Sequence, residues 1–411
     1  MMSPRPIGYF VHHQGRGHAE RCAAIVNALP QDQPVTIFCA RDDIFPRLGS
    51  GVEIVTIPSL FEPPAGPLPW TDWIATPDTM HCAPVGWPSI RQAMATMTRW
   101  FHEADPALMI SDVSAEVAQL ARLCSVPHVK ILQHGDRSDP GHMAAYRGAA
   151  GLLAPFHADL DHPDRPDWMR ALTFHAPGIG VNAALPAREA ARRALGIGPG
   201  RKLAVVVSGG GGDGWADAAF GVAARAFPDM GWIVIGKIQR DWHATLPANL
   251  HLAGWVDNAD DHIAAADLIV SSAGNTTCHQ VLAAARPWIV VPEWRYFDEQ
   301  RDKAQALGRA GAALHLPYLP ASAHAWQAAL AEAQRTHDPA IQQRLAGRDA
   351  APATARWLTG LCDRIWGQTP STDSRKGTSH VHDLGPDHRR RARRPSGERH
   401  PRVSGASDAA G

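Results

Sequence analysis

The sequence predicts an α/β protein made of two successive, doubly wound Rossmann-like domains. Three observations support this prediction. Short apolar runs bounded by Gly or Pro alternate with Ala-rich segments, which is typical of parallel sheets with crossover helices. The pattern breaks near residues 174–179 and then starts again. The length of 411 residues suffices for two ordinary domains and a tail.

Each half of the chain repeats the alternation of strands and helices. In the first half we expect strands at 7–11, 35–40, 52–57, 108–111 and 129–133, and helices at 19–28, 89–103 and 115–124. In the second half we expect strands at 202–208, 232–235, 250–252, 267–271 and 289–291, and helices at 216–226 and 340–366. These elements predict an N-terminal domain over 1–176 and a C-terminal domain over 177–366. The last helix closes the second domain and could pack on either one.

The end of the chain has a different composition. Residues 367–411 contain almost no large apolar side chain, so they cannot bury enough surface to offset their ordering entropy, and we expect a disordered tail. The arginine-rich run at 388–394 is either a solvated tail segment or a contact for anionic lipid or nucleic acid. The chain has a formal net charge of zero, and no nucleic-acid partner is expected.

Composition also indicates the compartment. No apolar run approaches the ~20 residues that a membrane span needs, and the chain enters its first strand without a signal-peptide region. The six cysteines have no CxxC spacing, which indicates free thiols. We therefore expect a cytoplasmic protein, with room for a peripheral contact at the inner face of the cell membrane.

The most informative segment is 266–292. An apolar strand at 266–270 runs into a turn of Ser, Gly, Asn and Thr, which is followed by an apolar helix and a second strand closed by Pro292. The start of a helix carries unpaired N–H donors and roughly +0.5 of a charge, so it suits a diphosphate. This segment therefore predicts a cradle for a nucleotide phosphate.

A second candidate site lies directly after the first strand. Residues 12–18 read His-His-Gln-Gly-Arg-Gly-His, and ligands bind at the carboxyl ends of strands in open α/β sheets. His18 would stand at a helix start, where an imidazole can accept a proton from an attacking hydroxyl. The alternative is a glycine turn with a histidine that only caps or packs.

Two further segments end in polar turns. Strand 205–207 runs into Ser208 and the four glycines 209–212, a loop that brings backbone close to a ligand or is simply flexible. No Gly-Lys-Ser/Thr follows, so it is not a Walker A loop. After Pro292, a carboxylate and an amide at 299 and 300 suit sugar hydroxyls, unless they belong only to a helix capped by Asp298.

In this order the motifs resemble the GT-B glycosyltransferases, close to family 28, which includes the lipid-II-forming N-acetylglucosaminyltransferase. The similarity spans about residues 7–366 and is strongest at 266–313. The family's glycine-rich turn is matched by 15–18, and its Gly-x-x-Thr-x-x-Glu-x-x-x-x-Gly-x-Pro signature by Gly274, Thr277 and Pro287. Gln280 replaces the glutamate that holds the ribose, and Ala285 replaces a glycine.

The family's Asp-Gln-x-x-Asn-Ala motif appears at 299–304, with Lys303 in place of asparagine. The resemblance implies two domains facing across a cleft and transfer of a sugar from a UDP-sugar, with UDP-N-acetylglucosamine as one candidate, to a small-molecule or lipid-linked acceptor. It implies no cofactor and no metal. His18 is the expected base and His134 a second candidate, with a packed histidine as the alternative. The implied donor-site residues are Gly17, Ser208, Gly210, Gly211, Trp255, Val256, Ser272, Gly274, Asn275, Thr276, Thr277, Gln280, Glu299 and Gln300.

Two other features and two rival functions stay open. The segment 61–100 holds four tryptophans, at 70, 73, 87 and 100, that could stack on sugars, lie against lipid headgroups or pack in a core. Asp159 and Asp161 have DxD spacing but follow no glycine turn, so we assign them no metal. The rivals are a UDP-sugar 2-epimerase of the same fold and a catalytically decayed nucleotide-sugar-binding protein.

Overall fold

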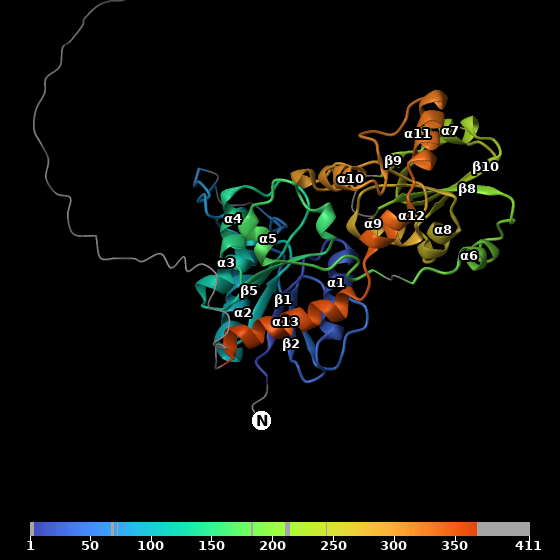
Figure 1. Ribbon diagram of the computed structural model, residues 1–411. Coiled ribbons are helices and arrows are strands. Elements are labelled where there is room, and N and C mark those ends of the chain that lie inside the picture. The colour runs from blue at the N-terminus through green and yellow to red at the C-terminus, as the bar shows by residue number, and fades with distance from the viewer. Residues whose placement is uncertain are drawn as a thin grey trace, which may run out of the picture. The chain divides into compact units, whose positions relative to one another are not determined.

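The computed structural model describes residues 4–66, 70, 71, 73–181, 184–209, 214–243 and 245–367 (Figure 1). Gly210, Gly211 and the tail from 368 onward lie outside the described residues, so the predictions on them stay predictions. The described chain contains two large parallel sheets, whose strands come from 7–175 and 202–315.

The first sheet has seven strands in the order β3-β2-β1-β4-β5-β6-β7. All neighbours are parallel, and Ile7 pairs with Val35 on one side and with Leu108 on the other. The strands are β1 (Ile7–Phe10), β2 (Val35–Cys39), β3 (Val52–Thr56), β4 (Leu108–Ser111), β5 (His128–Ile131), β6 (Gly151–Ala154) and β7 (Thr173–His175).

Helices cover both faces of this sheet because its strands are apolar on both sides. On β1, Tyr9 packs into the core with Cys22 of α1, whereas Phe10 packs with Met97 of α2 and Val117 of α3. The helices are α1 (Arg16–Ala28), α2 (Pro88–Ala104), α3 (Ala115–Leu123), α4 (Pro140–Arg147) and α5 (Asp167–Leu172).

The second sheet has six parallel strands in the order β12-β10-β8-β13-β14-β15. Val205 on β8 packs with α8 and α9, and Val206 packs on the opposite face with α7 and α11. The strands are β8 (Lys202–Ser208), β10 (Met230–Gly236), β12 (Leu250–Gly254), β13 (Leu268–Ser271), β14 (Trp288–Val290) and β15 (Leu314–His315); β9 (Trp215–Ala216) and β11 (Ile238–Gln239) form a separate pair.

The helices of this half are mostly short. They are α6 (Arg188–Ala194), α7 (Ala218–Ala226), α8 (Ala259–Ala265), α9 (Asn275–Ala284), α10 (Glu299–Arg309), α11 (Ala323–Arg335), α12 (Pro339–Ala346) and α13 (Ala350–Trp366). Two 3₁₀ turns complete the described elements, η1 (Ala158–Leu160) and η2 (Tyr296–Asp298).

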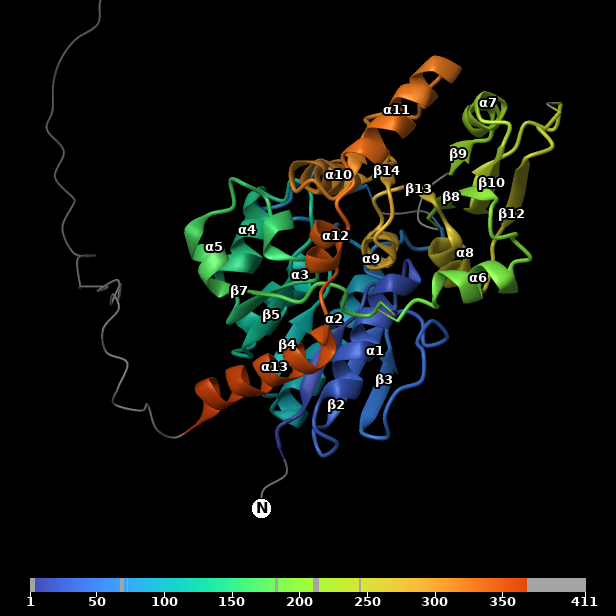
Figure 2. The same ribbon diagram turned by 45° about the vertical axis from the view of Figure 1, so that its right-hand side comes forward.

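The final helix returns to the first sheet. After α11 the chain runs through α12, which contacts α9, and into α13, which packs beside α1 (Figure 2). Leu358 of α13 is fully buried in one core with Ile7 and Tyr9, and Trp357 stacks on Phe174 with ring centroids 5.0 Å apart. The helix assigned to the C-terminal domain therefore covers the N-terminal sheet. The domain boundary near residue 177 stays a prediction.

The expected strands of both halves are present, but several short elements were not predicted: β6, β7, β9, β11, β15, α4, α5, α6, α8 and α11. The unpredicted strands have only two to four residues, too few to stand out from the loops around them. The single helix expected at 340–366 was wrong, because the helix breaks at Gly347, which has φ 71°, and the chain forms α12 and α13 instead. With these strands, the parallel sheets give the chain the mixed α/β fold that we expected.

Candidate active site

The carboxyl ends of the two sheets border one cleft with a volume of about 1730 Å³. This is the edge at which open α/β sheets bind ligands. Its lining includes most of the residues that the sequence indicated: Gly17, His18, His134, Trp255, Ser272, Gly274, Asn275, Thr276, Thr277, Gln280, Glu299 and Gln300.

The start of α9 forms the expected cradle. Gly274 is the N-cap residue and no side chain caps the helix. The first hydrogen bond of the helix runs from Cys278 N to Gly274 O at 2.9 Å. The N–H groups of the first turn therefore point toward the cleft as free donors. A Cβ on Gly17 would meet Thr276 Oγ1 at 3.0 Å, so the two predicted glycine turns lie directly against each other.

A cation lies beside this cradle. Lys303 Nζ donates to Asn275 Oδ1 at 3.2 Å, and the lysine is only 4% exposed. Burial lowers its pKa, although the nearby Glu299 carboxylate opposes that effect. For Glu299 burial acts in the opposite direction and raises the pKa. The charges of Lys303 and Arg137 outweigh this effect and hold the pKa of Glu299 below its usual value. Arg137 Nη2 lies 3.3 Å from Glu299 Oε2, so an alternating charge network borders the cradle.

Gln280 has a carboxylate partner. Its Nε2 donates to Asp260 Oδ1 on α8 at 2.8 Å. The position therefore presents an amide and a carboxylate together, although the family glutamate is missing. Asp260 was not predicted, because 20 residues separate it from Gln280 in the sequence.

His18 is paired with a buried acid that sequence reasoning missed. His18 Nδ1 lies 3.0 Å from Asp112 Oδ2 and 2.9 Å from Arg21 Nη2. Arg21 Nη2 donates to Asp112 Oδ2 at 2.5 Å, so the carboxylate stays available to accept a hydrogen bond from a proton carried on Nδ1. Asp112 is fully buried while the His18 side chain is 22% exposed, so the imidazole still faces the cleft. Burial raises the pKa of Asp112, but Arg21 and His18 hold it far below its usual range, so the group is a carboxylate.

The loop after β4 positions Asp112. Val113 has φ 73°, a left-handed backbone conformation that is strained for a β-branched residue. Lys130 Nζ donates to Val113 O at 2.9 Å and holds this turn. The available sequence signal was an acid directly after a buried strand.

His134 lies in a packed position. It is 5% exposed, its Nε2 lies 2.9 Å from Leu160 O, and its ring contacts Phe156 with centroids 4.1 Å apart. Burial and the charge of Lys303 hold its pKa well below the usual value. This geometry favours the packed alternative over a second base.

Several other donor-site predictions have structural roles. Gln300 Oε1 accepts hydrogen bonds from Ala273 N and Glu293 N, both at 3.0 Å, so it ties the cradle turn to the segment after β14. Ser208 is buried at the end of β8, and the Val256 side chain packs on the core, so neither lines the cleft. Trp255 does line it and is 71% exposed.

Aromatic side chains that the sequence did not single out border the cleft. Trp294 and Tyr296 form an edge-to-face pair with centroids 5.0 Å apart, and both are highly exposed, as is Tyr318. Their faces are free to stack on a planar base or a sugar. Of the tryptophans at 61–100, whose role the sequence left open, Trp100 packs in the core against Phe38, whereas Trp70 and Trp73 are exposed.

Parts of this sequence are similar to a protein family and to a known protein. Residues 235–349 match the model of the glycosyltransferase family 28 C-terminal domain. The UDP-N-acetylglucosamine–N-acetylmuramyl-(pentapeptide) pyrophosphoryl-undecaprenol N-acetylglucosamine transferase of Chromobacterium violaceum is 31% identical over 128 residues, which are 30% of this chain and 35% of that protein. The chain thus matches about a third of this relative's length. The family 28 resemblance is confirmed for the matched segment, residues 235–349.

Solved structures confirm the fold. MurG from Acinetobacter baumannii superposes with a TM-score of 0.51 at 15% identity, over 88% of this chain and 99% of that one. A UGT transferase from Siraitia grosvenorii in complex with UDP superposes with a TM-score of 0.61 at 12% identity, over 87% and 99%. The chain therefore has the GT-B fold that the resemblance implied.

Proposed function

We propose that the protein is a glycosyltransferase that moves a sugar from a UDP-sugar to an acceptor hydroxyl. One observation carries this proposal. An imidazole backed by a buried carboxylate faces a cleft in which the uncapped start of α9 offers free N–H donors and a buried lysine. The imidazole can accept a proton, and the start of α9 together with the lysine can hold a leaving diphosphate. These are the two requirements of sugar transfer.

In this proposal the second half of the chain holds the donor. The amides of Asn275, Thr276 and Thr277 bind the diphosphate, Gln280 with Asp260 binds the ribose hydroxyls, and Glu299 binds the sugar. The uracil base of UDP lies against the backbone at 254–257. The choice of UDP follows the name of the Chromobacterium relative and the UDP in the Siraitia complex. UDP-N-acetylglucosamine is the first donor to test.

The chemistry uses both sides of the cleft. With a proton on Nδ1 directed at Asp112, Nε2 of His18 is free to take the proton of the acceptor hydroxyl. The acceptor oxygen then bonds to the anomeric carbon, and the bond from that carbon to the diphosphate oxygen breaks. UDP leaves with the bonding electron pair. The helix start and Lys303 stabilise its charge, so the proposed reaction needs no metal.

An apolar pocket in the first half of the chain suits an acceptor with a hydrocarbon chain. It has a volume of about 190 Å³ and its lining includes Leu60, Phe61, Met80, Ile90 and Met94. The name of the Chromobacterium relative contains an undecaprenol-linked acceptor. We therefore favour a lipid-linked acceptor over a small soluble one. None of the described helices is long and apolar enough to cross a membrane. The protein would reach such a lipid from the cytoplasm, as a peripheral protein at the inner face of the membrane.

One incubation separates this function from its rivals. Purified protein is mixed with UDP-N-acetylglucosamine or UDP-glucose, with and without undecaprenol-linked or small hydroxyl acceptors, and UDP and products are measured. A transferase releases UDP only with an acceptor, and His18→Ala should lower turnover by roughly 10²–10⁴-fold while donor binding persists. A changed UDP-sugar without an acceptor would show an epimerase. Binding without turnover would leave only a nucleotide-sugar-binding protein.

A further inference from the structure

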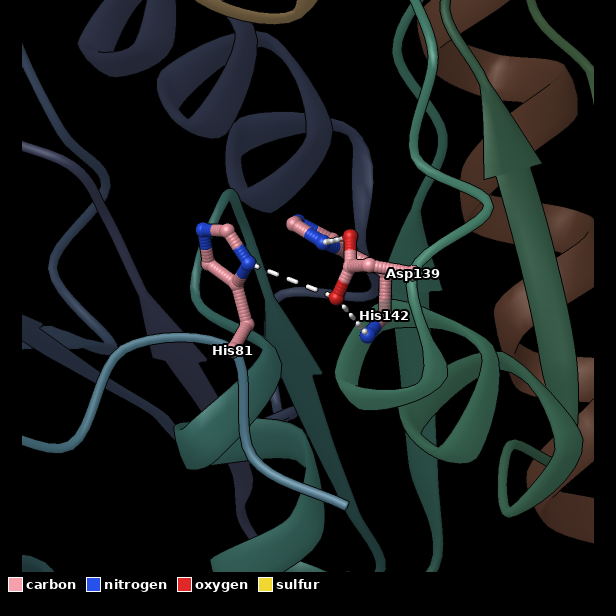
Figure 3. A group of neighbouring side chains, drawn as sticks. All are labelled: His81, Asp139 and His142. Carbon is pink, nitrogen blue, oxygen red and sulfur yellow. Dashed lines mark hydrogen bonds and ion pairs between the residues drawn. The ribbon is translucent and has the colours of Figure 1, made fainter. Parts of the chain in front are cut away.

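Three metal-ligating side chains meet outside the cleft. His81 Nδ1 lies 3.4 Å from Asp139 Oδ1, and His142 Nδ1 lies 2.6 Å from Asp139 Oδ2. In Figure 3 both imidazoles turn a nitrogen toward the Asp139 carboxylate. One ligand atom from each residue lies within 4.8 Å of the other two. None of these residues lines the cleft or takes part in the proposed transfer.

The backbone around this cluster is held firmly. Glu116 Oε1 accepts hydrogen bonds from His81 N at 2.9 Å and from Cys82 N at 2.7 Å, which fix the long segment before α2. A Cβ on Gly141 would lie 2.4 Å from His81 N, so this segment packs directly on the start of α4. Asp139 is the N-cap residue of α4. The three side chains are therefore placed by elements that do not depend on their mutual hydrogen bonds.

Their spacing suits a small divalent ion. Zinc binds imidazole nitrogen and carboxylate oxygen at about 2.0–2.2 Å in a tetrahedron, which puts neighbouring ligand atoms about 3.3 Å apart. The distance of 3.4 Å from His81 Nδ1 to Asp139 Oδ1 already has this value. His142 Nδ1 contacts the other carboxylate oxygen, Oδ2, at 2.6 Å, and this contact must open by less than about 1 Å. One ligand atom of each residue lies within 4.8 Å of the others, so small side-chain rotations suffice to bring all three to one ion.

We propose that His81, Asp139 and His142 form a binding site for one zinc-type divalent transition-metal ion, with a fourth position open to water. Two imidazoles and one carboxylate are a donor set that such ions prefer over Mg²⁺ or Ca²⁺. His81 is 30% exposed on its side chain, which leaves an entry path. The site joins the segment before α2 to α4.

The site also borders a contact between the two halves of the chain. The ring of Phe297 in η2 lies 5.2 Å from His81 and 5.4 Å from His142, centroid to centroid. Asp136 N donates to Phe297 O at 2.8 Å. A bound ion would fix both imidazoles against this ring, so it should stabilise the contact as well as the site.

The test uses the full chain without a histidine tag, stripped with a chelator and titrated with Zn²⁺ in a calorimeter. We expect one ion per chain and a higher melting temperature, and Co²⁺ should give the visible absorption of a tetrahedral complex. His81→Ala and Asp139→Asn should each weaken binding by at least about 10-fold. Asparagine keeps an N-cap acceptor, so the second variant should still fold.

His157 supplies the matched control. It pairs with Asp159 at 3.7 Å and is similarly exposed, but it belongs to no such cluster among the described residues. His157→Ala should bind Zn²⁺ like the parent protein. Binding that survives in both His81→Ala and Asp139→Asn, or that falls equally in His157→Ala, would show an adventitious ion only and would overturn the proposal. If His81→Ala does not fold by circular dichroism, His81→Gln takes its place.

Discussion

Replacing Lys303 with methionine removes the cation beside the diphosphate cradle while keeping most of the side-chain volume. Lys303 Nζ lies 3.2 Å from Asn275 Oδ1, so a phosphate oxygen bound to the first amides of α9 would lie at about 4–5 Å. At an effective dielectric constant of about 20, this charge pair attracts by roughly 3–4 kcal/mol. Glu299 offsets part of that attraction, and we expect a net loss of roughly 1.5–3 kcal/mol.

The loss should appear as an approximately 10- to 100-fold weaker binding of UDP, measured by calorimetry. Turnover should fall with it, because the charge on the leaving diphosphate is largest after the bond breaks. Lys303→Arg should recover part of both, whereas Lys202→Met, at an exposed lysine at the amino end of β8, should change neither. If the Lys303→Met protein folds and binds UDP as tightly as the parent, Lys303 does not face the diphosphate and our reasoning is wrong.

Four further changes test other parts of the site and the core. Asp112→Asn should lower turnover by about 10- to 100-fold with little change in donor KM, because it removes a charge-assisted hydrogen bond of about 1.5–3 kcal/mol from the base; an unchanged turnover would separate Asp112 from the mechanism. Gln280→Glu should weaken UDP-sugar binding because two carboxylates would then face each other at Asp260; tighter binding would contradict the shared ribose site. Burial lowers the pKa of Lys130 to about 7, below its unfolded value, so the unfolded chain binds more protons above pH 7 and urea stability should rise from pH 7 to pH 9. This rise in stability should vanish in Lys130→Met. If the variant's stability rises equally between pH 7 and pH 9, Lys130 is not its cause. Leu358→Ala should cost about 2–5 kcal/mol in urea unfolding, and a cost below about 1 kcal/mol would mean that α13 is not part of the first core.

The pattern along the chain was sufficient for the central features. Alternation of buried strands and Ala-rich helices predicted both sheets, because a parallel strand that is covered on both faces must be apolar along its length. The Gly-Asn-Thr turn after the strand at 268–271 predicted the helix start that lines the cleft. These features are local, since a strand, its turn and the next helix are neighbours in the sequence.

Partners that come from distant segments were decided only by the tertiary structure. His18 and Asp112 are 94 residues apart, and they meet because β4 lies next to β1 in the sheet order. Gln280 likewise contacts Asp260 and Lys303 contacts Asn275 because the fold brings their helices together. Sequence spacing does not encode which strand ends become neighbours.

The same limit explains the two largest differences. The end of the chain was recognised as helical, but only packing decided that α13 covers the N-terminal sheet, where it lies beside α1 in one core with Ile7 and Tyr9. Twenty-two histidines gave no reason to single out His81 and His142, which lie 61 residues apart and meet only where the segment before α2 crosses the start of α4. The sequence by itself determined the elements and the glycine turns, because these depend on local backbone chemistry. The tertiary structure decided which charged and polar side chains share a site, because that depends on strand order and helix packing.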